Sequence, residues 1–353
     1  MNLLNGVSGI MRVKNEEQFI SLSIDSCIDA LDELIIVYQD CDDNTPQIIH
    51  EKTKQYPNKI KAFHYKHSIK SHHLSDEEFD LFSKLPSTSP NLLSSYYNYA
   101  LSKCSYKYCL KIDADQIYNS GKLLTLCNAY RSKKKISYTL MERFAAFTLN
   151  LFASINSFYN CIFKNHKTLP YLGNTLINNY ESYVIKNITN KKNPVNLCGF
   201  NLYLKNNNPY IGNGTYNNNG FPPFNGVYDH MIFEISPNTY YLPNAIKSNH
   251  TKYGNCIIER FNYDRYLKNK FGFGWKWKLL QGGFMWFHTA PMKSQNNISL
   301  IIPFKSDIKT IKENPDFNSN LFNCTRFWVI QFYSNNKASY IEQSNISKIS
   351  EVL

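Results

Sequence analysis

What the sequence lacks excludes several classes of protein. No apolar run reaches the roughly 18 residues that a membrane-spanning helix needs, and residues 1–6 have neither the charged nor the apolar region of a signal peptide. The 9 cysteines form no Cys-x-x-Cys pair, which argues against a structural zinc site, and their odd number favours reduced thiols. No basic run is longer than residues 131–135, so no nucleic-acid partner is expected. We therefore predict a cytoplasmic protein, at most peripheral on the inner face of the cell membrane.

Charged residues are few, at 19%, but their balance is strongly positive, with a formal net charge of +12. Such a surplus favours anionic partners, for example nucleotide phosphates or an anionic membrane surface. With 353 residues, of which 43% are hydrophobic, the chain is globular and long enough for one large core or two modest domains.

Strand and helix patterns alternate through the first 65 residues. Residues 6–13, 34–38 and 59–65 are short apolar runs typical of buried strands, and the second is rich in β-branched side chains. Residues 19–31 and 47–56 have apolar residues at helical spacing. This order predicts right-handed crossovers, a parallel sheet and an α/β fold, with ligands bound at the carboxyl ends of the strands.

Two carboxylates, Asp113 and Asp115, follow the apolar run 108–112. Residues i and i+2 of an extended segment point to the same side, so both carboxylates are expected to face one cleft. Their oxygens suit a divalent cation that takes its remaining ligands from water and phosphates. The alternative is a solvated turn, since Asp is common at strand ends.

Residues 67–90 are polar, end in a Pro-Ser-Thr-Ser-Pro stretch, and predict a mobile loop over the sheet edge. This segment contains His72 and His73, but sequence neighbours rarely converge on one ion, so we interpret them as solvated loop residues. Residues 92–104 predict an amphipathic helix that leads into the strand before Asp113.

Four segments together resemble a known family. They are Met11-Arg12-Val13-Lys14-Asn15-Glu16, Asp32-Glu33-Leu34-Ile35-Ile36-Val37, the turn ending Asp43-Asn44-Thr45, and Leu110-Lys111-Ile112-Asp113-Ala114-Asp115. In this order they look like the nucleotide-sugar-binding domain of family 2 glycosyltransferases. The resemblance covers about residues 6–130 and implies the glycosyltransferase-A fold, a Rossmann-like and mostly parallel central sheet flanked by helices. It also implies a nucleotide diphosphate sugar as donor, in the first place a UDP-sugar, with Mn²⁺ or Mg²⁺ as cofactor.

The resemblance also implies roles for individual residues. Asp115 is expected to be the stronger metal ligand, and Asp113 to contact the ribose or a metal-bound water. Where the family has an Asp that hydrogen-bonds uracil, this chain has Tyr38 or Gln39. A Gln amide can donate to and accept from a pyrimidine edge, and a Tyr ring can stack on it. This departure affects the identity of the nucleotide more than its presence.

Three further residues in the first half are candidates for donor binding. Lys14 or Arg12, at the end of the first strand, is expected to contact the phosphates or the base; the alternative is a surface cation. Asn98 matches a family position near the nucleotide; the alternative is a role on the helix surface.

The second half is expected to supply the base. Inverting transfer needs a general base within hydrogen-bond reach of the acceptor hydroxyl. The family uses a carboxylate at a helix N-terminus, about a hundred residues after the paired Asp motif. Asp229, before the apolar residues 231–233, occupies the matching place, and a helix N-terminus would keep it ionised. Glu234 is the second candidate, and Asp229 as a simple helix cap is the alternative.

A C-terminal histidine often completes the metal shell in enzymes of this fold, and His288, after an aromatic run, resembles it. The alternative is a packed imidazole, which is also how we interpret His230. Lys293 is positioned in the sequence to reach the diphosphate. Trp275, Trp277 and Trp286 are candidates for stacking on a sugar or for a membrane interface.

The resulting prediction is one enzyme in three parts: a nucleotide-sugar-binding half at 1–135, an acceptor-binding and catalytic half at 136–298, and a C-terminal acceptor or lid extension at 299–353. It would transfer one hexosyl or N-acetylhexosaminyl unit to an oligosaccharide or glycolipid acceptor of the kind used for capsule or lipopolysaccharide, with inversion. The alternatives are a retaining enzyme with the same metal site, and a non-catalytic sugar- or nucleotide-binding module. A nucleotidyltransferase would need a Gly-rich phosphate loop, of which residues 6–9 are a poor version.

Overall fold

The computed structural model describes residues 2–149, 151, 174–205, 208–211, 224–247, 254–272 and 279–290. The chain divides into two compact units. The first unit comprises Met1–Ser21, Leu31–Ala114 and Phe233–Trp275, and the second comprises Leu22–Ala30, Asp115–Ile232 and Lys276–Leu353. The predicted extension at 299–353 lies outside the described residues.

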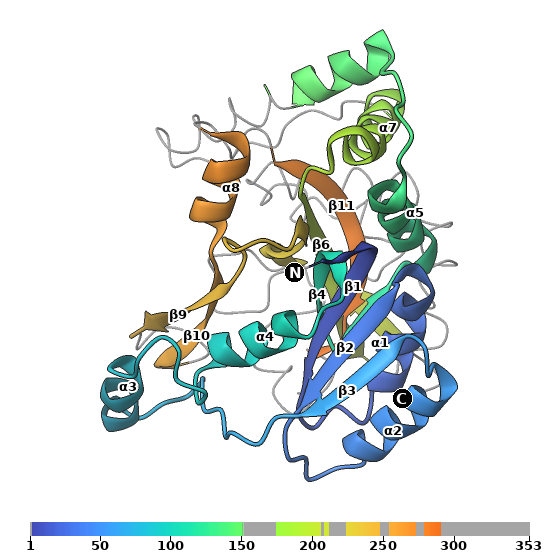
Figure 1. The fold of residues 1–353 in the computed structure, drawn as a ribbon. Helices are drawn as coiled ribbons and strands as arrows, with labels where there is room; N and C mark the ends of the chain where they lie inside the picture. The colour runs from blue at the N-terminus through green and yellow to red at the C-terminus, as the bar shows by residue number, and fades with distance from the viewer. Residues whose placement is uncertain are drawn as a thin grey trace. The chain divides into compact units, whose positions relative to one another are not determined.

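The first unit contains four parallel strands in the order β3-β2-β1-β4 (Figure 1). Their bounds are β1 Leu4–Val13, β2 Glu33–Tyr38, β3 Ile60–His64 and β4 Tyr106–Asp113. The middle of this sheet is fully buried at Ile10, Ile35 and Leu110, as expected for parallel strands covered on both faces. The α/β class predicted from the sequence is confirmed.

The helices of the first unit pack against these strands: α2 (Thr45–Gln55) on β3, and α4 (Leu93–Ser102) on β1 and β2. α2 begins at Thr45, two residues before the predicted helix at 47–56, and the fixed backbone angle of Pro46 suits its first turn. The loop predicted at 67–90 is wrong in part, because it contains α3 (Asp76–Ser83). Ser75 and Glu78 form a reciprocal capping box that starts this helix.

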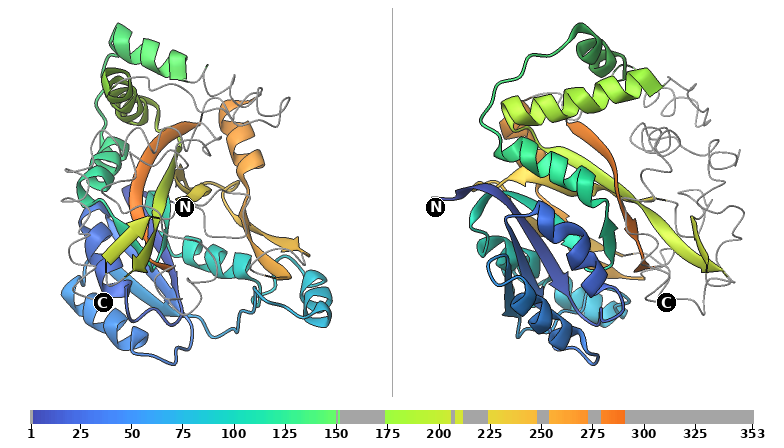
Figure 2. Two further views of the ribbon diagram at one scale, coloured as in Figure 1. Left: turned by 180° about the vertical axis from the view of Figure 1, so that it is seen from behind. Right: turned by 90° about the vertical axis from the view of Figure 1, so that its right-hand side faces the viewer.

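The second unit contains strands in the order β8-β6-β11-β5. β11 (Leu280–His288) runs parallel to β6 (Val195–Lys205) and antiparallel to β5 (Gln116–Tyr118). β6 also pairs antiparallel with β8 (Phe224–Glu234) and with β7 (Asn208–Ile211). Helices α5 (Ser120–Arg131) and α7 (Asn174–Lys191) pack on each other, as Figure 2 shows.

The division into units differs from the predicted halves at 1–135 and 136–298. After β8, the chain returns to the first unit, where the amide of Ile235 donates to the carbonyl of Lys107 at 2.8 Å. The hairpin of β9 (Tyr241–Ile246) and β10 (Cys256–Phe261), followed by α8 (Tyr263–Phe271), completes that unit. A local sequence pattern predicts helices and strands. It does not predict that the chain returns to an earlier unit, because the return depends on contacts between distant segments.

No helix among the described residues combines the length and the hydropathy that a membrane span requires.

Candidate active site

Asp113 ends β4 and lies beside a buried tyrosine of α4. The Tyr97 hydroxyl is 3.5 Å from Asp113 Oδ1, to which it donates, and it accepts from Arg12 Nε at 2.9 Å. The Arg12 guanidinium also lies 5.6 Å from the centroid of the Tyr97 ring. Tyr97 therefore links the cation at the end of β1 to the carboxylate at the end of β4.

A buried ion pair lies under the same ring. Lys111 Nζ is 2.7 Å from Glu259 Oε1, and the two side chains are only 3% and 11% exposed. Lys111 Nζ also lies 4.9 Å from the Tyr97 ring centroid. Burial raises the pKa of Tyr97 well above its usual range, although Arg12 and Lys111 oppose this. The hydroxyl is therefore neutral at physiological pH and remains able to donate to Asp113.

Arg12 is positively charged in this environment. Tyr97 above all, and then the carboxylates of Glu259 and Asp113, raise the pKa of Arg12, while burial alone would lower it. Lys14, the other candidate at the end of β1, is exposed. Of the two candidate cations, Arg12 is the one that Tyr97 links to Asp113.

Tyr38 and Gln39, the predicted substitutes for the uracil-binding Asp, lie at the carboxyl end of β2. The Tyr38 ring is half-buried with its centroid 5.4 Å from that of His64, and Gln39 is buried with its Nε2 donating to the carbonyl of His67 at 2.7 Å. Beyond the end of β3 lies a cavity of about 560 Å³. Its lining includes His64, Tyr65, Lys66, His67, Asn98 and Tyr99. A mixed aromatic and cationic wall of this kind suits a nucleoside or its phosphates.

Asn98 has a structural task that the sequence did not predict. Its Nδ2 donates to the carbonyl of Tyr241 at 2.9 Å, and its Oδ1 accepts from the Tyr241 amide at 2.8 Å. The Asn98 side chain thus holds β9 against α4, and Asn98 also lines the cavity.

Asp115 follows β4 and belongs to the second unit, where it is buried beside His288 at the end of β11. Asp115 Oδ1 is 3.4 Å from His288 Nε2, and the Asp115 carbonyl accepts from the amide and the hydroxyl of Thr289 at 2.9 and 3.0 Å. His288 Nδ1 is 2.7 Å from Asn201 Oδ1 on the neighbouring strand β6, its register partner. An amide oxygen only accepts, so this contact places a proton on Nδ1 and leaves Nε2 as the nitrogen that can bind a cation.

The donor set at Asp115 fits a divalent cation. A carboxylate oxygen and an imidazole lone pair 3.4 Å apart repel each other unless a cation or a proton lies between them. Neighbouring ligands of one ion are separated by about 3 Å when each bond is about 2.1 Å, so the two atoms can occupy adjacent positions. Asn201 fixes the ring in the way that outer partners of metal-bound histidines do. No group of three or more His, Cys, Asp or Glu suited to a metal occurs within the described part of the chain. Water and phosphate oxygens would have to supply the other ligands.

The predicted helix at Asp229 is wrong: Asp229 lies within strand β8, which pairs with β6 from Ile232 to Phe224. Met231 and Ile232 are buried in this strand, so their apolar run reflects a sheet and not a helix face. A helix N-terminus therefore does not hold the charge of Asp229.

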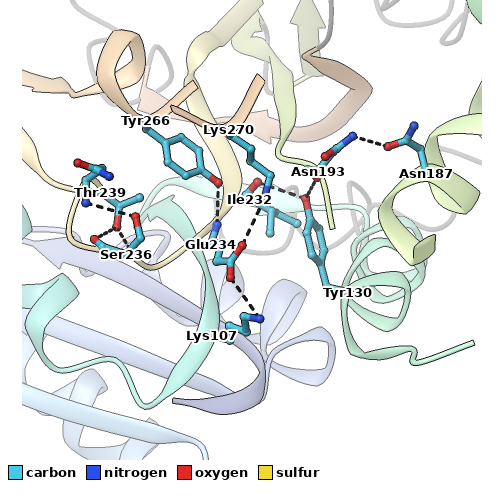
Figure 3. Close-up of polar contacts among 11 residues, drawn as sticks. Lys107, Tyr130, Asn187, Asn193, Ile232, Glu234, Ser236, Thr239, Tyr266 and Lys270 are labelled. Carbon is cyan, nitrogen blue, oxygen red and sulfur yellow. Dashed lines mark hydrogen bonds and ion pairs between the residues drawn. The ribbon is translucent and has the colours of Figure 1, made fainter. Parts of the chain in front are cut away.

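Glu234, the second candidate for base, is held between two lysines of the first unit (Figure 3). Its carboxylate lies 3.2 Å from Lys107 Nζ and 3.3 Å from Lys270 Nζ, and its amide donates to the Tyr266 hydroxyl at 3.1 Å. Burial alone would raise the pKa of Glu234, but the two lysines outweigh burial and lower it. A carboxylate with a lowered pKa is a weaker proton acceptor.

Trp286 and His230 are both buried. For Trp286, this burial contradicts the predicted role in stacking on a sugar or at a membrane interface. Trp286 has no exposed surface and packs against Tyr118 and His230, so it is unavailable to a sugar or a membrane. His230 is packed, as expected, with Nε2 2.8 Å from the side-chain nitrogen of Gln116. Lys293, Trp275 and Trp277 lie outside the described residues.

Sequence reasoning missed three residues that support the candidates: Tyr97, Glu259 and Asn201. The sequence contains an indirect signal for Glu259: Lys111 interrupts an apolar strand, and a buried lysine needs a counter-charge. Nothing in the sequence identifies Glu259 as that counter-charge, which lies 148 residues away.

Comparison with known proteins adds three findings. Residues 3–273 match the model of the β-1,4-N-acetylgalactosaminyltransferase family (CgtA). No curated protein matches the chain. Among solved structures, TarS from S. aureus matches with 17% identity and a TM-score of 0.20, over 32% of this chain and 17% of that chain. Glucosyl-3-phosphoglycerate synthase from Mycobacterium tuberculosis, in complex with Mn²⁺, UDP and phosphoglyceric acid, matches with 16% identity and a TM-score of 0.25, over 45% and 52%. The chain therefore spans about a sixth and about half of these two structures.

Proposed function

The chain belongs to the β-1,4-N-acetylgalactosaminyltransferase family, and from this premise we propose that it transfers N-acetylgalactosamine from UDP-N-acetylgalactosamine to a saccharide acceptor. The likeness to glycosyltransferases expected from the sequence is confirmed by this membership. The parallel strands and packed helices agree with the glycosyltransferase-A fold that was expected.

The arrangement of Asp115, His288 and Asn201 is the observation that carries the mechanism. Asp115 and His288 would hold Mn²⁺ or Mg²⁺, with Asn201 orienting the imidazole. When bound, the ion would act as a Lewis acid on the diphosphate leaving group. Asp113, two residues earlier in the chain, keeps its predicted role at the ribose or at a metal-bound water, and Tyr97 orients its Oδ1.

Donor recognition is proposed for the carboxyl ends of the strands in the first unit. Arg12 is a permanent cation suited to a phosphate, whereas Lys14, being exposed, would contribute a weaker and screened attraction. Tyr38 and Gln39 remain the proposed contacts to the base. The partly open cavity beside Asn98 offers aromatic faces near them.

Inversion is the proposed stereochemical course. A β-linked product made from an α-linked nucleotide sugar requires inversion at the anomeric carbon, and direct displacement by the acceptor hydroxyl provides it. The displacement needs a base, and we favour Asp229 because Glu234 is already engaged by Lys107 and Lys270. The leaving group is UDP, and the proton of the acceptor hydroxyl passes to the carboxylate.

The acceptor is proposed to be an oligosaccharide or a glycolipid. Lys293 remains a proposed contact to the diphosphate on sequence grounds. A retaining enzyme stays the second candidate, and its product would have the α configuration.

The test is a transfer assay with UDP-N-acetylgalactosamine and a panel of galactose-terminated oligosaccharides, with Mn²⁺ or with EDTA. We expect a product whose new anomeric proton shows the large coupling constant of a β linkage, formed only with the metal. A small coupling constant would establish retention. Binding of UDP without any turnover on the whole panel, together with unchanged binding in EDTA, would favour the non-catalytic module.

A further inference from the structure

The helix at 140–149 exposes an apolar face. Its exposed large apolar residues are Leu140 (85%), Met141 (52%), Phe144 (56%), Phe147 (66%) and, one residue beyond it, Leu151 (44%). Positions 140, 144, 147 and 151 are spaced by four, three and four residues, which places them on one side of a helix. We call these five residues the apolar stripe.

The opposite side of the same helix is already used for packing. Ala145, Ala146 and Leu149 are buried, and Glu142 on that side is bound to Ser182 and Lys186 of α7, with Glu142 2.7 Å from Lys186 Nζ. Figures 1 and 2 show this helix (green, unlabelled) beside α7. The helix is therefore anchored through one face, and the apolar stripe is a second, independent apolar face. Contiguous exposed apolar residues of this kind mark an interaction site.

The charges around the stripe identify its partner. Lys133, Lys134 and Lys135 are exposed just before the helix, and Arg143 is exposed within it. Glu142 is the only acid between residues 131 and 151, and it faces α7. An apolar stripe bordered by lysines, without carboxylates, has the composition of a helix that lies in the interface of an anionic bilayer. A second copy of the chain fits less well, because this surface is basic in both copies and Glu142, the one acid of residues 131–151, is already bound to Lys186 of α7.

We propose that the apolar stripe and the three lysines before it form a docking surface for an anionic lipid bilayer. In this arrangement the phenyl rings enter the acyl boundary and the lysines contact lipid phosphates or carboxylates. The proposal gives the expected peripheral membrane contact a definite location, away from the tryptophans suggested by the sequence. It does not depend on sugar transfer, since lipid binding is measured without donor or acceptor.

The experiment is sedimentation of the full chain with vesicles of phosphatidylcholine alone or with one third phosphatidylglycerol. We expect binding only to the anionic vesicles, weakened at least tenfold by the double change Phe144→Ser/Phe147→Ser. Lys133→Gln and Lys134→Gln should each weaken it about fivefold, and high salt should weaken it further. Leu81→Ser is the matched control, because Leu81 is 64% exposed on α3, and it should leave binding unchanged.

Three results would overturn the proposal. The first is no binding of the unchanged protein to anionic vesicles, and the second is equal binding by the double variant and Leu81→Ser. The third is a dimer in solution that the double variant converts to a monomer while vesicle binding stays the same. Transfer to a small soluble acceptor should be equal in all variants; its loss in every protein would count against the proposed function and leave the docking surface standing.

Discussion

The two carboxylates of the Asp113-Ala114-Asp115 motif are supported by different chemistry. Asp113 is approached by a neutral hydroxyl, Tyr97, which is itself held by a cation and stands over a buried ion pair. Asp115 is approached by an imidazole nitrogen, and a backbone amide and a hydroxyl of Thr289 hold its carbonyl. One carboxylate has a hydrogen-bond donor as its neighbour, and the other has a second potential ligand.

This difference assigns different tasks to two residues that the sequence presents as a pair. A donor on Asp113 Oδ1 withdraws charge and fixes one oxygen, which suits contact with a hydroxyl or a water. An imidazole nitrogen beside Asp115 offers a second ligand, which suits a bound cation. The predictions below test this assignment, beginning with the largest expected effect.

Replacing Asp115 with Ala should lower kcat/KM by about a thousandfold, because the ion would lose the carboxylate ligand proposed for it. The metal concentration that gives half-maximal activity should rise at the same time. Asp113→Ala should cost less, about tenfold to a hundredfold, and leave that metal midpoint nearly unchanged. Equal metal midpoints in the two variants would contradict the division of tasks; titration of activity with Mn²⁺ measures them.

Removal of the imidazole should have the next largest effect. His288→Ala should weaken Mn²⁺ binding about a hundredfold, and Asn201→Ala about tenfold, because loss of an outer partner frees the ring without removing the ligand. Calorimetric titration with Mn²⁺ and UDP measures both. If Asn201→Ala left Mn²⁺ binding intact, the orientation of His288 by Asn201 would not matter to the ion.

The sequence predicted the sheet well because its signals are local. A β-branched run identified β2, and apolar residues at helical spacing identified most of α2. α3 was missed although Ser75 and Glu78 spell a capping box, because the polar composition around them is also that of a loop.

The sequence failed where a residue's environment comes from distant segments. The apolar residues after Asp229 fit a helix or a buried strand equally well, and pairing with β6 decides for the strand. His288 was found as a candidate, but its partner Asn201 lies 87 residues away on another strand. Motifs in the sequence therefore predicted the candidate ligands, but they did not predict the groups that orient those ligands.

The smallest predicted effect is the most specific test of the comparison, because α4 supplies its own control. Tyr96 and Tyr97 are adjacent and buried, but the Tyr96 hydroxyl donates to the Val37 carbonyl at 2.7 Å, whereas that of Tyr97 faces Asp113. Tyr97→Phe keeps the ring over Arg12 and Lys111 and removes only the hydroxyl.

We expect Tyr97→Phe to lower kcat about tenfold, with the Mn²⁺ midpoint unchanged, since Asp113 Oδ1 loses its donor while Asp115 and His288 are untouched. Tyr96→Phe should lower the melting temperature by a similar amount, because each change removes one hydroxyl that makes two hydrogen bonds, but leave kcat within about twofold. Steady-state kinetics and thermal unfolding of both variants separate positioning from stability. Equal kcat values in the two variants would reduce Tyr97 to a packing residue.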